Sequence, residues 1–285
     1  MVKPTPVRLL WRLWRLWRLW PLWCLLFIAL LGPPVTALMG WDPTKPDILS
    51  ALSAPSIHHW FGTDAIGRDV LTRVIVAARL DLFMALGAVA LSASTGIAVG
   101  AVAASSPEWI GKAIGRITDV AMAFPLFVVA LALAAVFGNS VQSVLLATAI
   151  INVPFYIRLA RTELAIRYEA PYVLAARLSG WGEARILCRV LLPNSAPALL
   201  VQMTVNLGWA MLNGAGLSFL GLGVRPPTAE WGVMIGEGAS MMMGGQWWLW
   251  CFPGLALSGA VLALTLAGER LRDHFDPRRK EEAGR

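Results

Sequence analysis

Long apolar runs alternate with short polar connections along the chain, and the runs set the predicted architecture. Each run approaches or exceeds about 20 residues, the length at which an α-helix crosses the hydrocarbon core of a bilayer. Pro33 and Pro34 should interrupt the first run, and Pro125 and Pro154 should kink the third and fourth helices. We predict an all-α, polytopic membrane protein with about six transmembrane helices, over residues 19–38, 82–104, 119–138, 141–159, 196–222 and 249–268.

The amino-acid composition also indicates that lipid surrounds these runs. Apolar residues make up 57% of the chain and charged residues 14%, against about 25% charged in an average soluble domain. The net charge of +7 is spread between the apolar runs, so it favours membrane topology over nucleic-acid binding. Cys24, Cys188 and Cys251 are too far apart in the chain to suggest a metal or redox pair, and we interpret them as packing residues.

Basic residues predict the orientation in the membrane. If the N-terminus is cytoplasmic, 19 of the 24 Lys and Arg residues fall on cytoplasmic segments, as the positive-inside rule requires. Both termini should then be cytoplasmic. Residues 11–20 repeat Trp, Arg and Leu, a composition typical of the lipid headgroup region, so we interpret them as an interfacial anchor. A secretory signal cleaved near residues 35–37 is the alternative.

The charge pattern also divides the chain. Residues 1–40 should form the interfacial helix and the first transmembrane helix, and residues 41–81 an extracytoplasmic segment. Residues 82–285 should form the core membrane domain, with a long cytoplasmic loop over 160–195. This loop predicts two short helices, over 168–178 and 181–192, which Ser179 and Gly180 separate and Pro193 ends. Two such helices would make a knob that projects from the membrane.

The loop resembles the coupling loop of permease subunits in bacterial ABC importers. That family's pattern is Glu-Ala-Ala, three residues, Gly, nine residues and Ile-x-Leu-Pro, and Leu174 stands where the pattern has Glu. The resemblance implies that the knob docks onto a separate ATPase and passes its closure to the membrane helices. It places this contact on Tyr172, Leu174, Ala175, Ala176, Arg177, Gly180, Val190, Leu192 and Pro193.

Three further stretches are similar to the dipeptide, oligopeptide and nickel branch of these importers, in its second-permease type. They cover residues 59–70, 217–232 and 271–277. The resemblance implies a multi-pass protein of the bacterial inner membrane, with a second homologous permease, two ATPase subunits and an extracytoplasmic substrate-binding protein as partners, besides membrane lipid. Peptides are the expected cargo, and nickel or a metal–opine chelate is the alternative. The chain itself should bind no cofactor, since it lacks a phosphate loop; ATP and Mg would act on the partner subunits.

Two groups of polar residues are candidate sites. Asp64, Arg68 and Asp69 have a spacing that allows mutual pairing, or they could contact the binding protein; the full motif is Gly62, Thr63, Asp64, Gly67, Arg68 and Asp69. Gln202, Asn206 and Asn213 lie on one face of the fifth helix. That face could line a translocation path, or its side chains could bond neighbouring helices.

Other classes of protein have less support. We recognise no Ser/His/Asp, Cys/His or paired-carboxylate arrangement, so we expect no catalytic residues and no enzyme. His58, His59 and Met241 to Met243 could suggest a metal path, but the methionines precede an aromatic belt and we predict no metal site. An ion-coupled secondary transporter would need carboxylates within its spans, whereas Asp and Glu stand at span ends and in loops.

Overall fold

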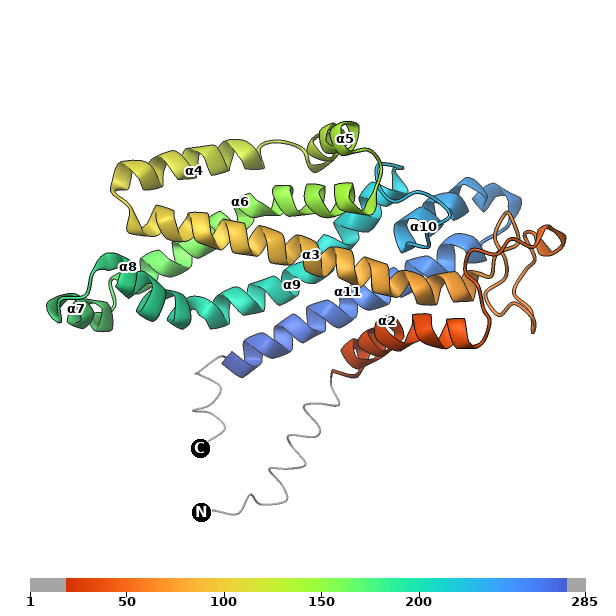
Figure 1. Cartoon of the computed structure of the whole chain (residues 1–285), viewed down its shortest axis with the longest axis horizontal. Coiled ribbons are helices and arrows are strands. Elements are labelled where there is room, and N and C mark those ends of the chain that lie inside the picture. Colours follow the sequence, from red (N-terminus) through yellow and green to blue (C-terminus); the bar gives the residue numbers. More distant parts are fainter. Residues whose placement is uncertain (1–18, 276–285) are drawn as a thin grey trace, which may run out of the picture.

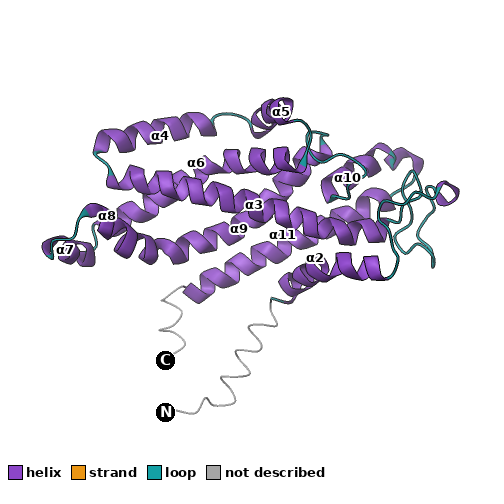
Figure 2. Ribbon diagram, in the orientation of Figure 1, coloured by secondary structure: helices purple, strands orange, loops and turns teal. Residues whose placement is uncertain are grey.

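The computed structural model describes residues 19–275, and within them the chain is helical apart from loops and one isolated bridge between Thr63 and Asp69. The N-terminal Trp/Arg repeat and the basic C-terminal end lie outside the described residues. Figures 1 and 2 show a bundle of long helices with loops gathered at its two ends. The long helices are α2 (Trp20–Leu38), α3 (Val70–Ser105), α4 (Glu108–Met122), α5 (Leu126–Phe137), α6 (Val141–Tyr168), α9 (Leu192–Phe219) and α11 (Trp248–Phe275). The shorter ones are η1 (Ile48–Ser50), α7 (Pro171–Leu178), α8 (Glu183–Ile186), η2 (Leu187–Leu191), α10 (Trp231–Ser240) and η3 (Met242–Gly244).

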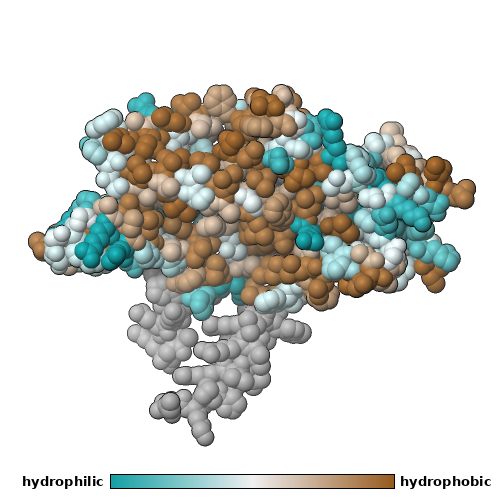
Figure 3. All heavy atoms as spheres, in the orientation of Figure 1, coloured by the Kyte–Doolittle hydropathy of each residue, from teal (hydrophilic) through white to brown (hydrophobic). Residues whose placement is uncertain are grey.

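Five of the described helices are long and apolar enough to cross a membrane, and a sixth span results if α4 and α5 are counted as one bent pair. This number agrees with the six spans that the apolar runs predict. Figure 3 shows the same division on the surface, since hydrophobic side chains cover the middle of the visible face and polar ones gather at both ends. The fold is therefore an all-α, multi-pass membrane bundle.

The start of α3 and the predicted interruption of the first run differ from the sequence prediction. α3 begins at Val70 rather than at residue 82, because the charged residues that break its apolar run, Arg73 and Asp81 among them, are buried inside the bundle. α2 continues to Leu38 through Pro33 and Pro34. A proline lacks the N–H donor but has a φ close to the helical value, so the helical conformation can continue although two hydrogen bonds are missing.

The third predicted span is broken, not kinked. α4 and α5 meet at an angle of 87°, and Pro125 stands immediately before α5 with an extended backbone. A proline disfavours the helical conformation in the residue before it, so α4 ends ahead of Phe124. Pro154, in contrast, lies within the uninterrupted α6.

Glycines bring the central helices close together. α3 packs along α6, and α9 along α11. A Cβ at Gly96 would lie 2.8 Å from the carbonyl oxygen of Val153, and one at Gly100 would lie 2.6 Å from that of Ile157. Small residues at such crossings let backbones approach, which is how membrane helices gain packing energy.

The two ends of the bundle are built differently. α7 and α8 form a knob at one end, and the loop before α3 lies with α10 at the other end (Figure 1). The candidate residues of the knob and those of the loop before α3 therefore lie at opposite ends of the bundle.

Candidate functional site at the two ends of the bundle

The turn inside the knob depends on Gly180. This residue follows α7 with a left-handed φ of +77°. The Gly180 N–H donates to the carbonyl of Arg177 at 2.9 Å, and the Trp181 N–H donates to that of Ala176 at 3.1 Å. These two bonds are the Schellman pattern that ends a helix at a glycine. The predicted break between the knob helices is therefore confirmed.

The inner face of the knob is anchored on the bundle. Val173 of α7 and Ile186 of α8 are fully buried and share a hydrophobic cluster with Ala101 of α3 and Leu164 of α6. Arg177 and Glu183 pair across the turn, with the Arg177 Nε 2.8 Å from the Glu183 Oε1. That hydrogen bond to Glu183 raises the pKa of Arg177 above its ordinary value. Because the knob is packed against two spans, a force on it reaches both of them.

The outer face of the knob is apolar and exposed. Leu174, Ala175 and Leu178 stand at helical spacing on α7, and the exposed fractions of Leu174 and Leu178 are 58% and 82%. Tyr172 is exposed beside them. Leu174, the residue that departs from the family pattern, completes this stripe. A partner would therefore meet an apolar surface here instead of a carboxylate.

The sequence predicted that the second knob helix ends at Pro193, and this prediction is wrong. The chain continues without interruption from Glu183 to Phe219, through the π-helical turn η2, which includes Val190, and into α9. Pro193 falls in the first turn of α9, where a proline is tolerated because N–H groups there need no helical acceptor. The π-helical turn before Pro193 is wider than an α-helical turn, and it accommodates the missing proline N–H within a continuous helix. The knob and the fifth span are thus one helix, and Leu192 begins its α-helical part.

At the opposite end, the predicted motif residues shape the loop before α3. Gly62 and Gly67 have left-handed φ values of +73° and +83°. The Thr63 hydroxyl accepts from the Ser53 N–H at 2.9 Å. Asp69 caps α3, since its Oδ1 accepts from the Thr72 N–H at 2.8 Å. Asp69 also faces His59, 3.0 Å away, and not Arg68.

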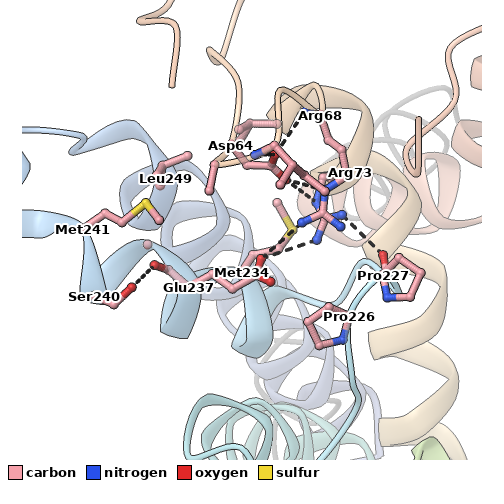
Figure 4. A pocket seen from close by; sticks show the side chains of 14 residues that line it. Asp64, Arg68, Arg73, Pro226, Pro227, Met234, Glu237, Ser240, Met241 and Leu249 are labelled. Carbon is pink, nitrogen blue, oxygen red and sulfur yellow. Dashed lines mark hydrogen bonds and ion pairs between the residues drawn. The ribbon is translucent and has the colours of Figure 1, made fainter. Parts of the chain in front are cut away.

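Asp64 and Arg68 pair as their spacing predicts, and the structure adds two residues to them. The Arg68 Nε donates to the Asp64 Oδ2 at 2.6 Å. Arg73 places its Nε 3.7 Å from the same oxygen, and Glu237 of α10 lies 3.6 Å from Arg73 and 3.7 Å from Arg68. Figure 4 shows the four side chains converging at one pocket. Sequence reasoning missed Arg73 and Glu237; Arg73 stands five residues after Arg68, but nothing local connects either to Glu237.

α10 is tied to the bundle by buried polar groups. The Glu230 carboxylate caps α10 by accepting from the Gly232 and Val233 N–H groups at 2.9 and 2.7 Å. The Trp231 N–H donates to Asp81 of α3 at 3.1 Å. α10 is therefore held against α3, which fixes the position of Glu237.

The three polar residues of the fifth helix have different surroundings. Asn206 is buried, and its side-chain N–H donates to the hydroxyl of Tyr156 on α6 at 3.0 Å. Asn213 donates to the carbonyl of Trp209 in its own helix. Gln202 and Asn213 are partly exposed. Asn206 thus bonds a neighbouring helix, whereas the other two reach an open surface.

Fold and site together define a class: a multi-pass membrane protein with an exposed apolar knob at one end and a charged pocket at the other. A family model described as "Binding-protein-dependent transport system inner membrane component" matches residues 96–281. The chain belongs to this family. It is accordingly the inner-membrane permease component of a transport system, and the importer resemblance of its motifs is confirmed.

Individual relatives show which transport systems the chain is similar to. The chain is 37% identical over 255 residues to the dipeptide transport system permease protein DppC of Alkalihalophilus pseudofirmus, which covers 90% of this chain and 83% of the relative. It is 37% identical over 256 residues to the nickel transport system permease protein NikC of Escherichia coli, covering 89% and 92%. Among solved structures, the MetNI methionine ABC transporter in an inward-facing conformation superposes with a TM-score of 0.60 at 17% identity, covering 70% of this chain and 95% of that one. The last similarity shows the fold alone.

Proposed function

We propose that this chain forms half of the translocation path of an ATP-driven importer for di- or oligopeptides. A second homologous permease would form the other half, two ATPase subunits would bind the cytoplasmic side, and an extracytoplasmic binding protein would deliver the cargo. The dipeptide permease relative supports peptide cargo. The nickel permease relative favours nickel or a metal chelate as the second candidate.

The knob carries this proposal. Its exposed stripe of Leu174, Ala175 and Leu178 is an apolar surface on a short helix that projects from the bundle, and such a surface marks protein contacts. Its buried side packs on α3 and α6. The ATPase would therefore bind the stripe and drive the spans through the buried side, while ATP and Mg stay on the partner.

The orientation is part of the same proposal. The excess of Lys and Arg on the knob side supports a cytoplasmic knob and cytoplasmic termini. The division into residues 1–40, 41–81 and 82–285 follows from this orientation. Because α3 begins at Val70, the segment outside the membrane would end there, ahead of residue 81.

Uptake by the reconstituted transporter tests the function. We expect vesicles that hold the permease pair and its ATPases to accumulate a labelled dipeptide when binding protein is present outside and ATP inside. Vesicles loaded with ADP are the control and should accumulate none. Uptake that an ion gradient drives without ATP would contradict the importer mechanism, and ATP-driven uptake of nickel but not of peptide would select the second candidate.

A translocation path along α9 makes a separate prediction. Gln202 and Asn213 are partly exposed on one face, whereas Leu212 is exposed on another. In a background without the three native cysteines, single cysteines at positions 202 and 213 should react with an aqueous maleimide in at least one nucleotide state, because thiols ionise only where water reaches them. Cysteines at 206 and 212 are the controls and should stay protected, the first by burial and the second by lipid. Protection of 202 and 213 in every state would rule out the path.

A further inference from the structure

A pocket of about 460 Å³ opens at the outer end of the bundle, between the loop before α3, the loop before α10 and α10 itself. Figure 4 shows Arg68 and Arg73 on one side of it and Glu237 with Met241 on another. Most other lining residues are apolar: Ile66, Pro226, Pro227, Met234, Met241 and Leu249. An apolar lining with a few convergent charged groups is the composition of small-molecule sites, which measure about 300–1,000 Å³.

Arg73 presents an unused donor to this pocket. Its side chain is 1% exposed, and its Nη1 donates to the Pro227 carbonyl at 3.3 Å. Its Nη2 is buried and makes no hydrogen bond, since the Glu237 Oε2 stands 3.6 Å away. Buried side-chain donors are nearly always hydrogen-bonded. The Nη2 group therefore has hydrogen-bonding capacity that its ion pair with Glu237 does not use, and a carboxylate matches a guanidinium best.

The charges around the pocket select among carboxylate ligands. Arg68 and Arg73 are opposed by Asp64 and Glu237, so the formal charges sum to zero. A simple anion would add an uncompensated charge to a partly desolvated site, which is unfavourable. A ligand that carries both a carboxylate and an ammonium group keeps the balance. Glu237, whose side chain is 38% exposed, is the more accessible of the two carboxylates, so it is the one that an ammonium group can reach.

We propose that this pocket binds a small zwitterion of dipeptide size. Its carboxylate pairs with the Arg73 Nη2, its ammonium pairs with Glu237, and its side chains lie on Met234, Met241 and Leu249. The volume exceeds what one acidic side chain of a docked protein would fill, which favours a free small molecule over the binding protein as the occupant. The peptide class rests on the proposed function, but Gln202 and Asn213 are not among the residues that line the pocket, so the site is distinct from the proposed path.

Direct binding to the assembled transporter tests this proposal. The complex is placed in nanodiscs without binding protein or ATP, and binding of the dipeptide Ala-Phe is measured by saturation-transfer NMR and thermophoresis. Its C-terminal amide and its N-acetyl form are the matched probes. We expect each to bind at least about tenfold more weakly, because each leaves one charged group of the pocket without its partner. Equal binding of the three probes, or equally tight binding of acetate, would overturn the proposal.

Substitutions that leave the buried charges in place test whether Ala-Phe binds in this pocket. Met241→Trp fills the pocket and should abolish Ala-Phe binding, whereas Met243→Trp, on a fully exposed neighbour outside the pocket, should leave it unchanged. Glu237→Gln should reduce the preference for Ala-Phe over its N-acetyl form. If Ala-Phe does not bind and Met241→Trp instead weakens binding of the binding protein, the occupant is that protein and the proposal fails.

ATP-driven uptake by the same complexes separates this proposal from the proposed function. Normal peptide uptake with no dipeptide binding at the pocket would refute the pocket and leave the function standing. Pocket binding without any ATP-driven uptake would refute the function and leave the pocket as a site for small zwitterions.

Discussion

Gly180→Val should uncouple ATP hydrolysis from transport. Gly180 holds the knob turn with a φ of +77°, and a left-handed conformation costs an L-residue about 1–2 kcal/mol, more for a β-branched one. The two hydrogen bonds that end α7 would be lost or weakened as the turn rearranges. We expect uptake to fall by about 5- to 30-fold, the ratio that this energy represents, while the ATPase subunits continue to hydrolyse ATP.

Gly182→Val is the matched control. Gly182 is two residues away, and a Cβ at either glycine would meet nothing within 4 Å, so crowding is equal. Gly182 has an ordinary φ of −73° and an extended backbone, which valine adopts readily. Uptake and ATP hydrolysis are both measured in reconstituted vesicles. If the two variants transport equally well, the left-handed turn is not what the coupling requires.

Gly67→Ala should prevent the loop before α3 from folding. Gly67 combines a φ of +83° with a Cβ position only 1.7 Å from the carbonyl oxygen of Asp47. Strain of about 1–2 kcal/mol is thus added to overpacking of about 1–3 kcal/mol. We expect a marked loss of thermal stability in the purified complex, together with loss of the Asp64–Arg68 pair that this turn positions.

Gly40→Ala separates the two causes. Gly40 has a similar φ of +73°, but a Cβ there would meet nothing within 4 Å. It should therefore cost only the strain of about 1–2 kcal/mol. Thermal unfolding of both variants, followed by intrinsic tryptophan fluorescence, measures the difference. Equal destabilisation would mean that the contact with Asp47 is not a true constraint on the loop.

Local signals in the sequence predicted the features that local physics controls. The length of the apolar runs gave the number of spans, and Ser179-Gly180 gave the turn of the knob. The pairing of Asp64 with Arg68 also followed from a spacing of one helical turn. Each of these depends on residues close together in the chain.

Other features depend on tertiary contacts and could not be read in this way. Pro193 is a helix breaker by propensity, yet it lies in a first helical turn because a π-helical segment precedes it. Residues 70–81 look too polar for a span, yet Arg73 and Asp81 are buried because other elements supply their partners. Glu237 joins the arginines through the packing of α10 on α11, α9 and α3.

The unbroken helix from Glu183 to Phe219 has a mechanical consequence. Its 37 residues make a rod about 55 Å long, with the knob at one end and the contact with α10 at the other. At the end that contacts α10 the backbones touch, since a Cβ on Gly232 of α10 would lie 2.1 Å from the carbonyl oxygen of Ala215. A tilt of the rod that begins at the knob would therefore move α10, and Glu237 with it, at the opposite end. A movement of the knob and a movement of the charged pocket would then be two ends of one rigid-body rotation.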